Sequence, residues 1–227
     1  MDKYFSDELT DRQIQVIMHT MSYIGSTPDD ISIIKSEEYI SDTFPIDVVI
    51  FKPNNYMDCY IMQTVGLSSY YFSKDVARSE LLMVLPKTWK EVFDKDEFNW
   101  PKDLLLDIAY GMVENNRGPM IGQVHLPNDE FVYDGSPNIV GGIIVLPEDF
   151  SLEFCEEYIE EGYTKFMQVV PISKEDLSKI EEVGPGKFIE FDLHDGEGAN
   201  FVVKLKEKKL EGIDRIIKQN EDNLKND

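Results

Sequence analysis

Residues 46–51 read IDVVIF and residues 60–65 read YIMQTV, two short apolar runs separated by the turn cluster KPNN at residues 52–55. Runs of this length, rich in β-branched residues and bounded by Pro and Asn, are typical of strands, and their spacing predicts a hairpin with a longer loop. A third run, LLMVL at residues 81–85, ends at Pro86, which lacks the backbone donor that a central strand needs. Three buried strands therefore form the predicted centre of the fold.

Helical patterns flank these strands. Apolar residues recur at helical spacing between Ser6 and Ile24, and Trp100-Pro101 opens a second helix because Pro suits the first helical turn. Residues 173–176 have the form of a capping box and predict a short helix to about Val183. Further strands are predicted over residues 121–126, 142–146, 164–172, 188–193 and 201–205, the last two as a hairpin.

The order of these elements predicts the fold class. Strands and helices mix without a strict β-α-β rhythm, so we expect an α+β fold with a mostly antiparallel mixed sheet and flanking helices. We expect a single domain over residues 1–205. Residues 206–227 are highly charged, with apolar residues near helical spacing, and predict a C-terminal helix or tail.

The chain is strongly acidic. It has 227 residues, with 22 Lys and Arg against 44 Asp and Glu, and a formal net charge of −22. At 42% hydrophobic residues it is apolar enough to fold. The charge disfavours nucleic acid and anionic membranes as partners, because both present negative charge. A basic protein partner is compatible with it.

We expect a cytoplasmic location. The first residues, MDKYFSDELTD, contain four acids and no apolar segment typical of a secretory signal. No apolar run approaches the length that spans a bilayer. Cys59 and Cys155 are the two cysteines; two isolated thiols are typical of a reducing compartment, although a disulfide between them stays an alternative.

Motifs for catalysis are absent from the sequence. It contains no P-loop, no Gly-x-Gly-x-x-Gly after a strand, and no Gly-x-Ser-x-Gly. His19, His125 and His194 have no metal-ligand spacing, and His19 is expected on a helix surface. The acidic stretch from Asp192 to Asn200 is weighed as a calcium loop, but an acidic turn is favoured because Val203 stands where an EF-hand needs Glu. We predict no catalytic residues, no cofactor and no metal.

The acids between Glu148 and Glu161 form a run that contains no Lys or Arg. Two interpretations are compatible with it: the solvated face of a helix packed by interleaved aromatic residues, or an acidic surface presented to a basic protein. On the second interpretation the partner-binding residues are Glu153, Glu156, Glu157, Glu160 and Glu161.

The order of several short motifs resembles suppressor-of-fused-like domain proteins. Residues 64–68 read TVGLS and residues 78–86 read RSELLMVLP. Trp100-Pro101 starts a helix, and Leu-Pro and Pro-Ile steps follow at residues 146–147 and 171–172. The similarity spans roughly residues 9–183. Each motif is weak alone, but their order and spacing together are specific.

The resemblance implies a binding module. Animal members bind zinc-finger transcription factors of hedgehog signalling through a peptide, and stand-alone bacterial members are commonly regarded as immunity proteins against polymorphic toxins. The chain looks like the bacterial type, so we expect a non-enzymatic immunity-type protein that neutralises a toxin, with a basic toxin domain favoured by the charge. The alternatives are a peptide-binding regulatory adaptor, or a carboxylate- or metal-dependent hydrolase that uses the Asp192 to Asn200 loop.

Overall fold

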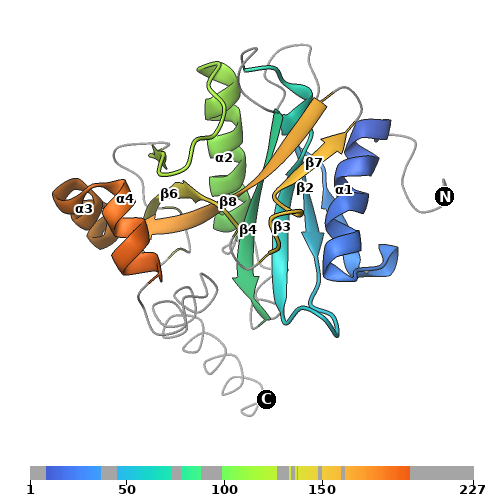
Figure 1. Ribbon diagram of the computed structural model, residues 1–227, viewed down its shortest axis with the longest axis horizontal. Helices are drawn as coiled ribbons and strands as arrows, with labels where there is room; N and C mark the ends of the chain where they lie inside the picture. The colour runs from blue at the N-terminus through green and yellow to red at the C-terminus, as the bar shows by residue number, and fades with distance from the viewer. Residues whose placement is uncertain are drawn as a thin grey trace, which may run out of the picture.

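An eight-stranded mixed sheet forms the centre of the fold (Figure 1). The computed structural model describes residues 9–36, 45–72, 78–87, 99–126, 133, 136, 138–147, 150–159 and 162–194. Seven strands follow the order β1-β2-β3-β4-β8-β6-β5, and β7 pairs with β8 beside that path. The strands are β1 (Ile31–Ile34), β2 (Asp47–Phe51), β3 (Cys59–Val65), β4 (Arg78–Pro86), β5 (Val124–His125), β6 (Ile139–Val145), β7 (Glu156–Ile159) and β8 (Gly162–Ser173).

The pairing confirms the predicted fold class. β4 and β8 run parallel, with Arg78 opposite Thr164, whereas the other pairs in the sheet are antiparallel. The predicted hairpin is β2–β3, in which Val49 faces Gln63, and the third run forms β4. The run at residues 121–126 forms only the two-residue β5, a shorter strand than its apolar pattern predicts.

The helix α1 (Asp11–Ile24) covers one face of the sheet. It begins at a capping box, in which the Thr10 hydroxyl accepts a hydrogen bond from the Gln13 backbone amide, so it starts later than the predicted Ser6. Its apolar residues pack against one set of alternating strand residues, including Val49. Ser6 itself lies outside the described residues.

The helix α2 (Trp100–Glu114) covers the opposite face. Trp100 is buried at its start, and Pro101 lies in its first turn, as predicted. Gly142 of β6 permits the close approach of this helix, because a Cβ there would lie 3.0 Å from the Ile108 Cδ1 and 2.7 Å from Val169. Neither α1 nor α2, the two longest helices in the described part of the chain, has the length and hydrophobicity of a membrane-crossing segment.

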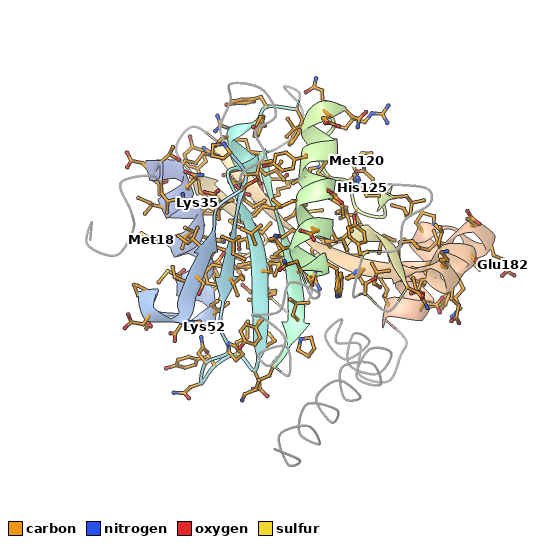
Figure 2. The ribbon with its side chains drawn as sticks, turned by 180° about the vertical axis from the view of Figure 1, so that it is seen from behind. Met18, Lys35, Lys52, Met120, His125 and Glu182 are labelled. Atoms are coloured by element: carbon orange, nitrogen blue, oxygen red, sulfur yellow. The ribbon has the colours of Figure 1, made fainter. Side chains whose placement is uncertain are left out.

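Short helices pack at the β6–β8 end of the sheet. The helix α3 (Lys174–Val183) begins at the predicted capping box of Ser173 and Asp176 and is followed by α4 (Pro185–Lys187). Figure 2 places Glu182 of α3 at the opposite end of the molecule from Met18 of α1. The strand predicted at residues 188–193 is wrong: Phe188–His194 forms a π-helical turn. Its predicted partner at 201–205 and the tail from 206 lie outside the described residues.

The π-helical turn has a packing reason. Phe188 and Leu193 are both buried in the cluster that β6 and β8 form with α3. The two residues are five positions apart, which matches one π-helical turn and places both on the same side. An extended chain would direct Phe188 and Leu193 to opposite faces and leave one of them in water.

Candidate functional site

The predicted acidic surface lies on and before the β7–β8 hairpin, next to α1 (Figure 1). Glu153 precedes β7, while Glu156 and Glu157 belong to it. The helical interpretation of this run is wrong, because residues 156–159 form an antiparallel strand with β8. Glu153 and Glu156 are exposed and Glu157 is half-buried. Glu160 and Glu161 lie outside the described residues.

Aromatic rings support the inner face of this hairpin. Phe154 is fully buried, with its ring centroid 4.3 Å from that of Phe150 and 5.3 Å from that of Phe166 of β8. Ile159 is also buried, at 2% exposure. Phe150 and Phe154, two of the aromatic residues that suggested a helical core face, therefore anchor this segment to α1.

His19 joins α1 to the hairpin. It is only 7% exposed, so its predicted place on a helix surface is wrong. Its Nε2 donates to the Phe154 carbonyl at 2.9 Å, and its Nδ1 lies 3.4 Å from the Glu157 carboxylate. The ring also stacks on Phe166, with centroids 4.6 Å apart. The hairpin buries a helix position that the periodicity of α1 alone leaves exposed.

Arg12 holds the same hairpin from within. Its guanidinium donates to the Ile159 carbonyl at 3.1 Å and to the Thr164 hydroxyl at 2.8 Å. Its Nε donates to the Ser68 hydroxyl at 3.3 Å. Arg12 is buried, so these bonds lie in a low-dielectric environment, where hydrogen bonds of a charged donor are strong. The β7–β8 hairpin is thus tied to α1 and to the segment after β3.

Glu80 is fully buried beside Ser68. Its carboxyl group accepts hydrogen bonds from the Thr64 hydroxyl at 2.7 Å, the Gly66 amide at 3.1 Å and the Ser68 amide at 3.0 Å. Burial raises the pKa of Glu80 above its usual value, while these hydrogen bonds oppose that rise. Gly66 adopts a φ of 121°, which glycine adopts readily and which brings its amide to the carboxyl group.

Arg78 contacts an aromatic ring. It lies on the same face of β4 as Glu80, and its guanidinium lies over the Tyr71 ring, 4.1 Å from the ring centroid. The motif residues therefore stabilise the fold around the segment that follows β3. They do not form a nucleophile, base and orienting group.

The outer face of the hairpin carries two exposed tyrosines. Tyr158 was interpreted as one of the aromatic residues that pack a helix, which is wrong, and Tyr163 was missed. Tyr158 and Tyr163 are directly opposite in the β7–β8 register, and their ring centroids are 5.3 Å apart with the planes at 79°. Their exposed fractions are 60% and 56%. The β-type residues of GYTKF at 162–166 indicate a strand, but only the pairing with β7 brings Tyr163 to Tyr158.

The other candidate chemistry is dispersed over the described residues. Cys59 and Cys155 are not joined by a disulfide, and burial raises the pKa of the Cys155 thiol. The Asp192 carboxylate, which lies in the π-helical turn, is 3.4 Å from the Lys179 ammonium of α3. His125 lies between α2 and the end of the molecule that contains α3 (Figure 2). Its burial lowers the pKa of its ring. Within the described ranges, no three His, Cys, Asp or Glu side chains are grouped as metal ligands. Most of the Asp192 to Asn200 loop lies outside those ranges.

Comparison with known proteins identifies the relatives of this chain. The family model described as suppressor of fused protein matches residues 42–205. No curated protein matches the sequence.

Solved structures share the fold. A Neisseria gonorrhoeae protein described as a suppressor of fused homologue superposes with a TM-score of 0.61 at 12% identity, covering 85% of this chain and 93% of its own. The protein of the Sufu–Fu complex crystal structure gives 0.57 at 15% identity, with 79% and 82% covered. Drosophila Suppressor of Fused gives 0.54 at 14% identity, with 92% of this chain and 55% of that protein covered.

Proposed function

This chain belongs to the suppressor of fused family, and from that premise we propose that it is a non-enzymatic protein-binding module. The observation that carries the proposal is the family match over residues 42–205. A structurally similar protein was solved in a complex, the Sufu–Fu complex, which supports the same kind of activity here. The motif residues are consistent with it, because Glu80 and its donors are buried and engaged in the fold.

The finer proposal is an immunity-type protein that acts in the cytoplasm and neutralises a toxin domain. The net charge of −22 favours a basic toxin, because complementary charge accelerates encounter and disfavours wrong partners. The acids at the β7–β8 hairpin, Glu153, Glu156 and Glu157 together with Glu160 and Glu161, are the proposed contact residues.

Co-expression with each protein encoded by the adjacent genes tests this function. We expect the full chain to co-purify with a toxin domain among them and to restore growth of cells that express it. A variant with Glu153→Gln and Glu156→Gln should protect less well than one with Glu181→Gln and Glu182→Gln. The two variants remove the same charge, but the second changes exposed residues of α3, away from the hairpin. Failure to bind any neighbouring gene product would overturn the immunity proposal.

A peptide-binding adaptor is the second candidate, favoured by one observation. Among the described strands, β7 pairs only with β8, so one backbone edge of the hairpin is available for an added strand. A pull-down that recovers short unfolded peptides and no folded toxin would favour this candidate.

A hydrolase remains the third alternative. It would use acids of the Asp192 loop, and substituting Asp192, Asp195 and Glu197 together tests it. Retention of every phenotype by that variant would exclude a role for this loop.

A further inference from the structure

The two faces of the β7–β8 hairpin differ sharply. The inner face packs against α1, and Ile159 and Phe166 on it are 2% and 0% exposed. The outer face presents Tyr158 and Tyr163 to solvent as an edge-to-face pair, here called the tyrosine pair. Adjacent large aromatic side chains exposed on one strand pair are typical of binding surfaces, because Tyr combines an apolar ring with a polar hydroxyl.

The tyrosine pair stands on a pre-organised support. Arg12 bonds to the carbonyl of Ile159, which follows Tyr158, and to the hydroxyl of Thr164, which follows Tyr163. Both anchors reach the hairpin from the α1 side, so they hold its backbone without covering the rings. A rigid backbone lowers the entropy that a partner must remove on binding, which raises affinity without further contacts.

The charge around the tyrosine pair selects a cationic ligand. Glu156 lies two residues before Tyr158 on the same face of β7, opposite Lys165 of β8. In the sequence, Glu160 and Glu161 join the two strands. Glu156 and Lys165 balance within the described part of this face, so the attraction of positive charge comes from the net charge of −22 of the whole chain, in addition to the aromatic rings that the face offers.

We infer that the tyrosine pair binds an arginine side chain of the partner protein, with the guanidinium on a ring face and the Glu156 carboxylate neutralising its charge. This inference rests on the proposed protein-binding function and names the group recognised. A planar guanidinium stacks on aromatic rings and bonds to carboxylates, whereas an ammonium does so less well. The chain already contains such a contact, with the Arg78 guanidinium 4.1 Å from the Tyr71 ring centroid. A second copy of this chain is disfavoured as the occupant, because both surfaces are acidic.

A short peptide of alternating glycine and arginine is the first probe. Its control is the same peptide with citrulline in place of arginine, which keeps the shape and removes the charge. In NMR titrations of the full chain, we expect the arginine peptide to shift the ring resonances of Tyr158 and Tyr163. The arginine δ-CH₂ protons should move upfield through ring currents, and citrulline should give neither effect.

Charge-neutral variants separate specific binding from general attraction to an acidic protein. Tyr158→Leu and Tyr163→Leu keep the net charge, and each should weaken the arginine peptide roughly two- to fivefold, the range of exposed cation–π contacts. Tyr158→Phe keeps the ring and should restore binding. Tyr56→Leu is the matched control, since Tyr56 is 84% exposed before β3, outside the hairpin. Equal affinity in the Leu variants and the wild type, with folding confirmed by thermal midpoint, would refute the inference.

A second comparison distinguishes this inference from the proposed function. If the toxin domain encoded by the adjacent gene binds the wild type and Tyr158→Leu equally, the tyrosine pair is not its contact and the inference fails while the function stands. If no neighbouring product binds but the arginine peptide shows the expected ring dependence, the immunity function fails and the inference holds. Glu156→Gln should weaken the peptide more than Glu114→Gln, an equal loss of charge at the end of α2.

Discussion

Replacing Glu80 tests whether its buried carboxyl group is held in the protonated form. In Glu80→Gln, the amide oxygen can accept from the Gly66 and Ser68 amides, as Oε1 does in the wild type. The amide nitrogen can donate to the Thr64 hydroxyl, which then donates to the Leu81 carbonyl at 3.3 Å. Because these three partners are retained, we expect the free energy of unfolding to change by less than about 1 kcal/mol.

Glu80→Ala provides the contrasting case. It leaves the two buried backbone amides without an acceptor, at about 1–3 kcal/mol each, so the loss is about 2–6 kcal/mol before any cavity cost. This is a large share of the roughly 5–15 kcal/mol that stabilises a typical domain. Urea unfolding followed by Trp fluorescence measures it, because Trp100 is buried.

The pH dependence of stability tests the direction of the pKa shift of Glu80. The pKa of Glu80 is raised by burial from its usual value of 4.5, so on raising the pH the unfolded chain loses this proton first. Wild-type stability should therefore fall relative to Glu80→Gln as pH rises from about 4.5, until the native group ionises. A wild type that gains stability relative to Glu80→Gln over this range would refute protonation of the buried carboxyl.

Three further changes test other parts of the fold. Gly142→Ala should lower the free energy of unfolding in urea by about 1–3 kcal/mol, because the added Cβ would meet side chains of α2 and β8. Its control is Gly111→Ala, where the Cβ would enter open space in a helix, and this change should raise the free energy of unfolding by about 0.5–1 kcal/mol. Ser173→Ala should cost about 0.5–2 kcal/mol and speed amide exchange in α3, since it removes the cap; unchanged exchange would contradict this. His19→Leu leaves the Phe154 carbonyl without its donor and should speed exchange in β7 while α2 stays protected.

The sequence predicts elements that are specified locally. The runs that form β2, β3 and β4 are apolar over their whole length, and Ser173 begins α3 because its capping box needs only residues three apart. By contrast, residues 188–193 alternate like a strand, and only burial of Phe188 and Leu193 against β6 and β8 favours a π-helical turn.

The candidate site depends on distant contacts, which a linear pattern does not contain. The acids of β7 were identified from composition, but their strand conformation depends on pairing with β8 and on support from Arg12. The tyrosine pair forms only through the β7–β8 register. The position of His19 was predicted wrongly for the same reason. The Phe154 carbonyl that its ring contacts is 135 residues away in the sequence, just before β7.

The parallel β4–β8 pair has a consequence for synthesis on the ribosome. Arg78 of β4 pairs with Thr164 of β8, about 86 residues later in the chain. Because synthesis adds roughly 5–20 residues per second, β4 would remain the unpaired edge of the β1–β4 meander for about 4–17 s. Its apolar residues are then a binding site for holdase chaperones and a risk for aggregation. Slow codons between β4 and β8 should lower soluble yield more than slow codons after β8.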